Sequence, residues 1–124
     1  MVVITSQEIA RFRSELAFYP EALKALDEIE DCEGNIEDAA ISLAIQAGQE
    51  PNISENWLDG LAKRCRVAIC KSELKEDLTN GRLNAAFGDL VAASICPEIL
   101  VAAVIIYVFK TGVNEFCEPL EYKL

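Results

Sequence analysis

The chain has 124 residues, of which 11 are Lys or Arg, 21 are Asp or Glu and none is His. One domain is expected at this length, because the commonest domains contain about 100–150 residues. The absence of His excludes a Ser-His-Asp or Cys-His catalytic site and an imidazole-bound metal within this chain. Hydrophobic residues make up 52% of the chain, which is enough for a sizeable core and argues against disorder.

Charge is unevenly distributed along the chain. Residues 1–62 contain 3 basic and 13 acidic residues, whereas residues 63–124 contain 8 of each. The first part therefore carries a net charge of 3 − 13 = −10 and repels nucleic acid and anionic membrane. Such a surface suits a basic protein partner, although acidic surfaces also favour solubility.

Helix-terminal signals mark the first three expected helices. Thr5 and Glu8 form the pattern of a capping box at the start of the first helix. Pro20 ends that helix and opens the second. Gly34 suits a left-handed turn after the second helix, and Asn35 is the expected N-cap of the third.

The remainder of the chain predicts three further helices and a tail. A helix capped by Asn52 or Ser54 can continue to the Asn-Gly turn at residues 80–81, and residues 82–95 and 97–111 predict two more. The last of them contains eleven consecutive apolar residues. A membrane span needs about 20, so we expect a central core helix and no membrane association.

Together these patterns predict an all-α protein, a compact bundle of six or seven helices. A single domain, residues 1–124, is expected to contain an acidic three-helix unit (1–48), core helices that cover it (54–112) and a tail (113–124). The first residues are too short and too uncharged for a secretory signal, so a cytoplasmic location is expected.

A motif at the second turn adds a resemblance to a known family. The stretch GNIEDA at residues 34–39 turns the chain into the third helix. With it, residues 7–47 resemble the ubiquitin-associated (UBA-like) three-helix module, which has a G-N-x-E-x-A turn at this place. The resemblance implies a three-helix fold and a recognition loop that corresponds to LAF at residues 16–18, where the family's glycine is missing.

A second resemblance covers most of the chain. The stretches WLDGLAKRCRVAIC and YVFKTGVNEFCEPL look like those of a cyanobacterial protein family. This resemblance implies no activity, cofactor or site residue.

Five cysteines are present, and the odd number argues against a complete disulfide framework. The shortest spacing is C-x4-C, between Cys65 and Cys70. Reduced, mostly buried thiols are expected, with a redox pair or a soft-metal site as the alternative.

The function that these features favour is a non-catalytic protein–protein interaction or adapter module, without metal or cofactor. Its partner is expected to be a protein, basic in character, and a homo-oligomer is compatible with the sequence. The residues expected to contact the partner are Leu16, Phe18, Glu30, Asp31 and Glu33.

Two alternatives from other classes remain. One is a small helical enzyme or thiol redox sensor, in which Cys65 and Cys70 form the pair. The other is a nucleic-acid-associated regulatory factor, which the net charge disfavours because nucleic-acid-binding domains are usually basic overall. Its contact residues would be Lys63, Arg64, Arg66 and Lys71.

Overall fold

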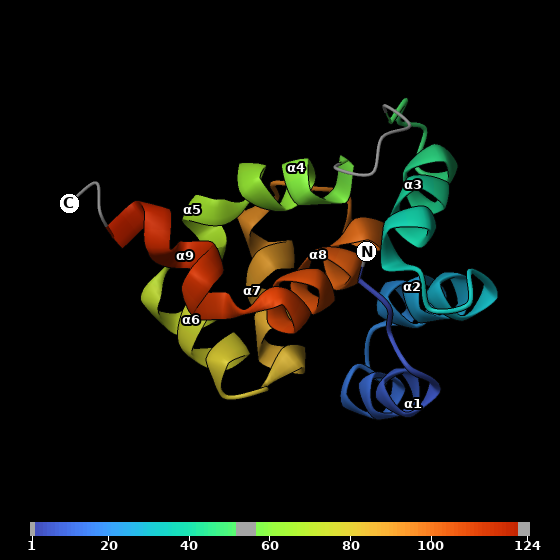
Figure 1. Ribbon diagram of the computed structural model, residues 1–124, viewed down its shortest axis with the longest axis horizontal. Helices are drawn as coiled ribbons and strands as arrows, with labels where there is room; N and C mark the ends of the chain where they lie inside the picture. Colours follow the sequence, from blue (N-terminus) through green and yellow to red (C-terminus); the bar gives the residue numbers. More distant parts are fainter. Residues whose placement is uncertain (1, 52–56, 122–124) are drawn as a thin grey trace.

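The computed structural model describes residues 2–51 and 57–121, and this part of the chain is all-α (Figure 1). The expected fold class is therefore confirmed. The described residues form nine helices, more than the six or seven expected. The helices are α1 (Ser6–Glu15), α2 (Pro20–Asp31), α3 (Ile36–Gln46), α4 (Trp57–Arg64), α5 (Arg66–Ile69), α6 (Ser72–Thr79), α7 (Leu83–Ala93), α8 (Glu98–Thr111) and α9 (Val113–Glu121).

The additional helices come from two places. The segment expected as one helix up to the turn at residues 80–81 is divided into α4, α5 and α6. Its backbone leaves the helical region at Lys71, which has φ −66° and ψ 147°. The expected tail forms a further helix, α9. The helix caps predicted at Asn52 and Ser54 lie outside the described residues.

The predicted caps of the first three helices are present. The Thr5 hydroxyl accepts from the Glu8 backbone N–H at 3.1 Å, and a Glu8 carboxylate oxygen accepts from the Thr5 backbone N–H at 3.0 Å. Gly34 has φ +86°, and the Asn35 side chain accepts from the backbone N–H of Asp38. Local sequence thus fixes where these helices begin and end.

The three N-terminal helices pack side by side, with α2 between α1 and α3 (Figure 1). The extended residues before α1 return to the turn between α2 and α3. There the Ile4 backbone N–H donates to the Gly34 carbonyl at 2.8 Å, within an isolated antiparallel bridge between Val3 and Asn35. This contact holds the residues before α1 against the turn between α2 and α3.

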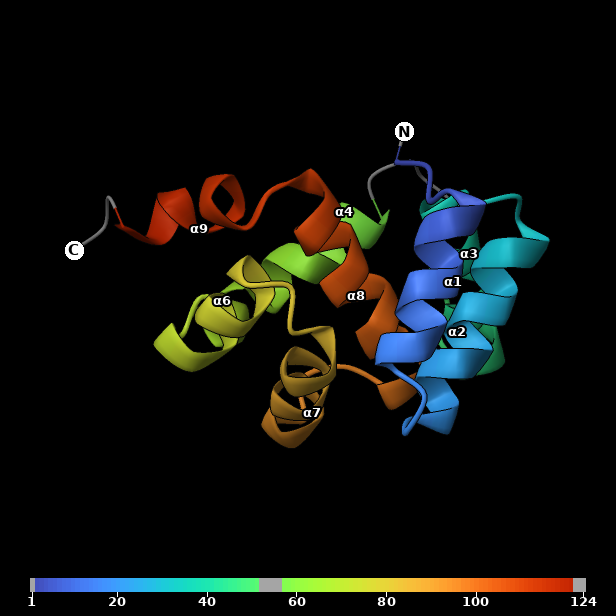
Figure 2. The same cartoon turned by 90° about the horizontal axis from the view of Figure 1, so that it is seen from below.

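Helix α8 is the centre of the molecule, as its apolar sequence predicts. It packs against α2, α3, α4, α6, α7 and α9, and Figure 2 shows it between the N-terminal helices and the others. Its buried residues are Leu100, Val101, Ala102, Ala103, Val104, Ile105, Ile106 and Val108. Within the described residues, no single helix is long and apolar enough to cross a membrane; α8 and the following segment Val113–Pro119 reach that length together but are bent by 97°.

A disulfide between Cys70 and Cys117 attaches α9 to the end of α5. The two cysteines are 47 residues apart in the sequence, and their Cα atoms are 5.6 Å apart. Val113 and Phe116 of α9 are also buried. The expectation of reduced thiols is therefore wrong for this pair.

Candidate functional sites

The most exposed large apolar side chain in the described part of the molecule belongs to Phe18, in the connection between α1 and α2. Its exposed fraction is 91%, whereas Leu16, two residues earlier, is fully buried. Of the two apolar residues predicted to contact a partner in this loop, Phe18 alone is therefore accessible. A buried leucine cannot touch a partner while the helices remain packed.

The loop that carries Phe18 is fixed at both of its ends. Leu16 anchors one end in the core. At the other, the ring of Tyr19 packs against Phe87 of α7 with 4.4 Å between ring centroids. The Tyr19 backbone N–H also donates to the Leu16 carbonyl at 3.0 Å. The turn closed in this way directs Phe18 to the outside.

Exposing this ring forfeits a favourable contribution to folding. Burial of a phenylalanine side chain is worth about 1.5–3 kcal/mol. Aromatic residues that are presented on a fixed backbone often anchor protein interfaces, because they offer a large contact area at a small entropic cost. Phe18 therefore has the properties of an interface anchor.

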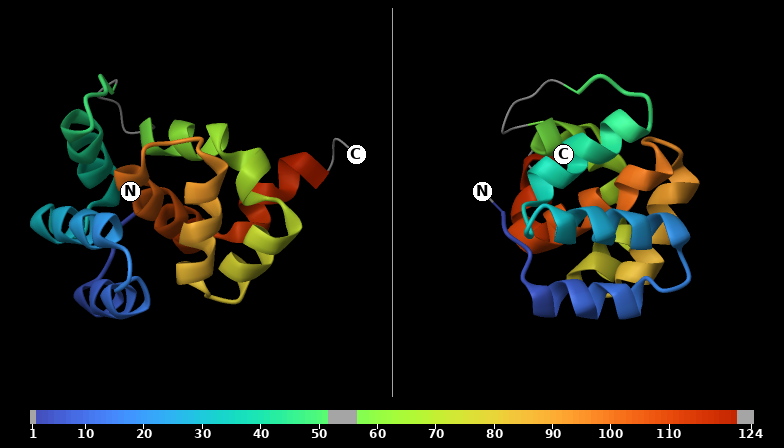
Figure 3. Two further views of the ribbon diagram at one scale, coloured as in Figure 1. Left: turned by 180° about the vertical axis from the view of Figure 1, so that it is seen from behind. Right: turned by 90° about the vertical axis from the view of Figure 1, so that its right-hand side faces the viewer.

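Two further exposed apolar side chains come from neighbouring segments. Ile45 lies in the last turn of α3 and is 59% exposed, and Ile95 lies between α7 and α8 and is 46% exposed. The α1–α2 connection, the end of α3 and the α7–α8 connection run along one side of the molecule (Figure 3, right). We call Phe18, Ile45 and Ile95 together the apolar edge.

The acidic residues predicted to contact a partner lie elsewhere. Glu30 and Asp31 end α2, and Glu33 follows them, whereas Phe18 precedes that helix. The two ends of α2 are about 18 Å apart, since an α-helix rises about 1.5 Å per residue. The structure therefore does not bring the acidic residues together with Phe18 in one contact.

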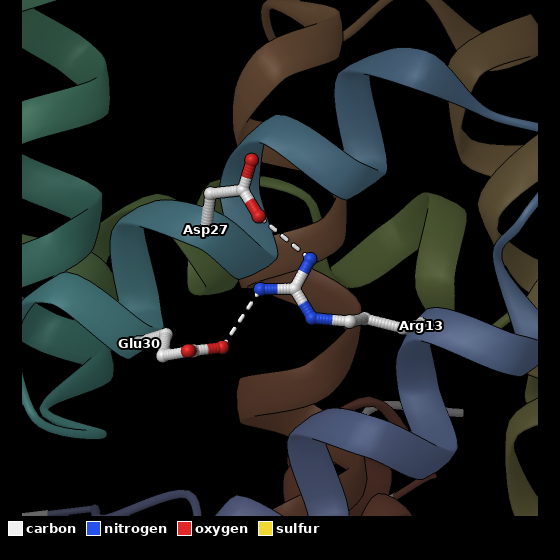
Figure 4. A network of polar contacts seen from close by, with 3 residues as sticks. All are labelled: Arg13, Asp27 and Glu30. Carbon is white, nitrogen blue, oxygen red and sulfur yellow. Dashed lines mark hydrogen bonds and ion pairs between the residues drawn. The ribbon is translucent and has the colours of Figure 1, made fainter.

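One of these acidic residues is already paired within the molecule. Arg13 of α1 donates to Asp27 at 2.6 Å and to Glu30 at 2.8 Å, as Figure 4 shows. The hydrogen bond to Glu30, and to a smaller extent the one to Asp27, raises the pKa of Arg13. Glu30 thus helps to hold α1 against α2, while Asp31 and Glu33 are exposed.

The basic residues of the nucleic-acid alternative do not form one free cationic surface. Lys63 is paired with Asp59 at 2.7 Å. The Arg66 guanidinium lies 4.9 Å from the ring centroid of Phe116, and its Nε is buried without a hydrogen-bond partner among the described residues. Arg64 and Lys71 are exposed and line different pockets. Two of the four charges are therefore engaged within the fold.

The structure does not pair Cys65 with Cys70, the two cysteines of the C-x4-C spacing. Cys65 and Cys70 lie at opposite ends of α5, and each has a partner from a distant segment. Cys70 is bonded to Cys117, while Cys65 and Cys96 line one pocket and shift each other's pKa. Sequence spacing gave no signal for either partner, because both contacts depend on how the helices pack.

A pocket of about 300 Å³ between α6 and α7 brings carboxylates together. Glu73 and Asp89 line it, and partial burial together with the nearby Asp77 raises the pKa of Asp89. Such a pair is one requirement for acid–base chemistry. Among the described residues, no group of three or more Cys, Asp or Glu residues is arranged to hold a metal ion.

No protein-family model, curated protein or solved structure matches the chain.

Proposed function

We propose that this protein is a non-catalytic interaction module that binds another protein through the apolar edge. The observation that supports the proposal is the presentation of Phe18, which is 91% exposed on a loop whose two ends are anchored. Interfaces of this kind place an aromatic anchor in an apolar pocket of the partner, within a polar rim. Phe18 is the proposed anchor, and Ile45 and Ile95 extend the contact.

The net negative charge of the molecule indicates that the proposed partner is basic. Residues 1–62 carry the whole net charge of −10, and the exposed acidic end of α2 belongs to them. A basic partner is attracted to this field before contact, which raises the association rate at low ionic strength. We therefore assign Asp31 and Glu33 a role in steering the partner rather than in the contact itself.

The proposal is tested by comparing three immobilised proteins as baits in an extract of the source cells. They are the wild type, Phe18→Ser, and the matched control Val67→Ser, in which an apolar side chain of 66% exposure on α5 is changed. Both substitutions are at exposed positions and should change the free energy of unfolding by no more than about 0.5 kcal/mol. We expect proteins that bind the wild type and Val67→Ser but not Phe18→Ser.

Two further measurements identify the partner class. Titration with ubiquitin tests the resemblance to the ubiquitin-associated module, and sedimentation of the wild type tests whether a second copy of the chain is the partner. Retention should also fall with salt, because exposed charges are screened beyond about 10 Å at 0.1 M ionic strength. Equal retention of every protein by the three baits would contradict the proposal.

A further inference from the structure

Two cysteines outside the disulfide, Cys65 and Cys96, lie together on the wall of one pocket. The pocket has a volume of about 210 Å³, and Arg64, Ile95 and Pro97 also line it. Cys65 lies between α4 and α5, and Cys96 lies in the connection between α7 and α8. The two thiols are close enough to shift each other's pKa. Their contact is therefore made by two segments that are far apart in the sequence.

The two thiols differ in their access to solvent. Cys65 is fully buried, whereas Cys96 is half-buried. A reagent dissolved in water therefore meets Cys96 first. Cys96 also belongs to a connection rather than to a helix, so it can approach Cys65 without breaking a helical hydrogen bond. A disulfide bond needs the sulfur atoms at about 2.0 Å.

The surroundings favour a thiolate within this pair. The neighbouring Cys96 thiol lowers the pKa of Cys65 against the opposing effect of burial, and the charge of Arg64 contributes in the same direction. Cys65 in turn raises the pKa of Cys96. Cys65 is thereby placed to accept the proton of Cys96 when the Cys96 sulfur reacts. The thiolate is the reactive form in thiol–disulfide exchange.

We propose that Cys65 and Cys96 are a redox-active dithiol, which small neutral disulfides oxidise to a second intramolecular disulfide. This site is separate from the Cys70–Cys117 bond. Ile95 lines its pocket and also belongs to the apolar edge, so the tests of the two proposals leave Ile95 unchanged. A small neutral reagent suits it, because the pocket is small and the protein carries a net charge of −10.

The exchange has two steps. In the first, Cys96 Sγ attacks one sulfur of the reagent, the reagent's S–S bond breaks, and the Cys96 proton passes to Cys65 Sγ. The thiolate that leaves takes this proton. In the second, the Cys65 thiolate attacks Cys96 Sγ and displaces the other half of the reagent, which is protonated by solvent. Two electrons pass from the dithiol to the reagent, and two thiols are released.

The test uses the full chain with its Cys70–Cys117 disulfide intact and bis(2-hydroxyethyl) disulfide as the probe. Peptides are mapped by mass spectrometry without reduction. In the wild type we expect a Cys65–Cys96 cross-linked peptide that retains no part of the probe. Cys65→Ser should retain one half of the probe on Cys96, and Cys96→Ser should show no adduct on Cys65.

Cys32 provides the matched control. It is half-buried like Cys96, and its pKa is also raised, by partial burial and then by the charges of Glu28, Asp38 and Asp31, but it does not line the pocket that holds Cys65 and Cys96. Cys32→Ser should therefore form the Cys65–Cys96 cross-link at the wild-type rate. Circular dichroism shows whether each variant is folded, and the wild-type map decides the question even if Cys65→Ser fails to fold.

Three results would overturn the inference. They are a wild type in which Cys65 and Cys96 stay unmodified, a wild type that keeps the probe on Cys96, and a Cys65–Cys70 cross-link. None of them would affect the comparison of Phe18→Ser with Val67→Ser, so the two proposals fail separately.

Discussion

At Gly34 a single added methyl group should have a large effect on folding. The residue has φ +86°, and a Cβ atom there would lie 2.3 Å from the carbonyl oxygen of Ile4. Gly48 provides a matched control, because it has φ +81° and no atom within 4 Å of the same position. Gly48→Ala should lose about 1–2 kcal/mol of stability, from backbone conformation alone.

Gly34→Ala should lose about 1–3 kcal/mol more than Gly48→Ala, because the N-terminal segment must also move away. Urea unfolding of both variants measures the difference. Equal losses would show that the contact between Ile4 and Gly34 is not part of the folded state.

Tyr107 links stability to alkaline pH. Its hydroxyl donates to Asp59 at 2.9 Å, and partial burial, followed by this hydrogen bond and the charge of Asp59, raises its pKa to about 12. Because the folded pKa lies above the ordinary value of about 10, the resulting stability is complete below pH 10 and is lost as the pH rises through 12.

The Tyr107→Phe variant should lack this step. The wild type should show an absorbance change from tyrosinate formation near pH 12, and the variant should not. The unfolding midpoint of the variant should also fall less than that of the wild type between about pH 10 and 12. A wild type whose tyrosines all ionise near the ordinary value would contradict the hydrogen bond to Asp59.

Residue-level features differ in how well the sequence predicts them. The caps at Thr5 and Asn35 depend on partners three residues away, so they could be predicted from local spacing. Leu16 and Phe18 are both apolar and both flank a helix end, yet one is fully buried and the other is 91% exposed. Only the packing of α1 and α2 on α7 and α8 separates them, and no local pattern reports it.

Among the elements, α9 depends most on a single covalent bond. The Cys70–Cys117 disulfide closes a segment of 47 residues. A loop of this length corresponds to about 4 kcal/mol of stabilisation through restriction of the unfolded chain. Cys117→Ser should lose a stability of that order in urea unfolding.

The control for this variant is Cys32→Ser, which removes a thiol that forms no disulfide. Reduced wild type should match Cys117→Ser, and the reducing agent should leave Cys117→Ser unchanged. If reduction left the urea midpoint of the wild type unaltered, α9 would be held by packing of Val113 and Phe116 alone.

The division of one expected helix into α4, α5 and α6 could not be predicted from the sequence. No Gly or Pro lies between Leu61 and Thr79, and the apolar spacing is compatible with one continuous helix. With these breaks Leu61, Ile69 and Leu74 are all buried, and α4, α5 and α6 each contact a different set of helices. Tertiary packing therefore overrides a helical pattern that has no interruption of its own.

For the whole molecule, folding depends on α8. Ile105 is fully buried in this helix, so Ile105→Ala should lose about 2–5 kcal/mol through the cavity that it creates. Ile105→Asp should prevent folding, because it buries a charge without a partner. Circular dichroism and sedimentation of both variants test this expectation. A folded monomeric Ile105→Asp would show that one side of α8 is exposed.

The all-α class and the central position of α8 could be predicted from the sequence, because apolar residues surround that helix on every side. The arrangement of the other helices could not. The apolar edge and the contact between Cys65 and Cys96 each combine segments that meet only after packing. The candidate sites are therefore properties of the assembled fold.

We propose that Phe18 is a contact residue for a protein partner. Photo-crosslinking tests it most directly, with benzoylphenylalanine placed at position 18 and, as a control, at position 67 of the full chain in living cells. We expect a discrete adduct with another protein at position 18 and none at position 67. Illumination that gives no adduct at position 18, or the same adducts at both positions, would contradict it.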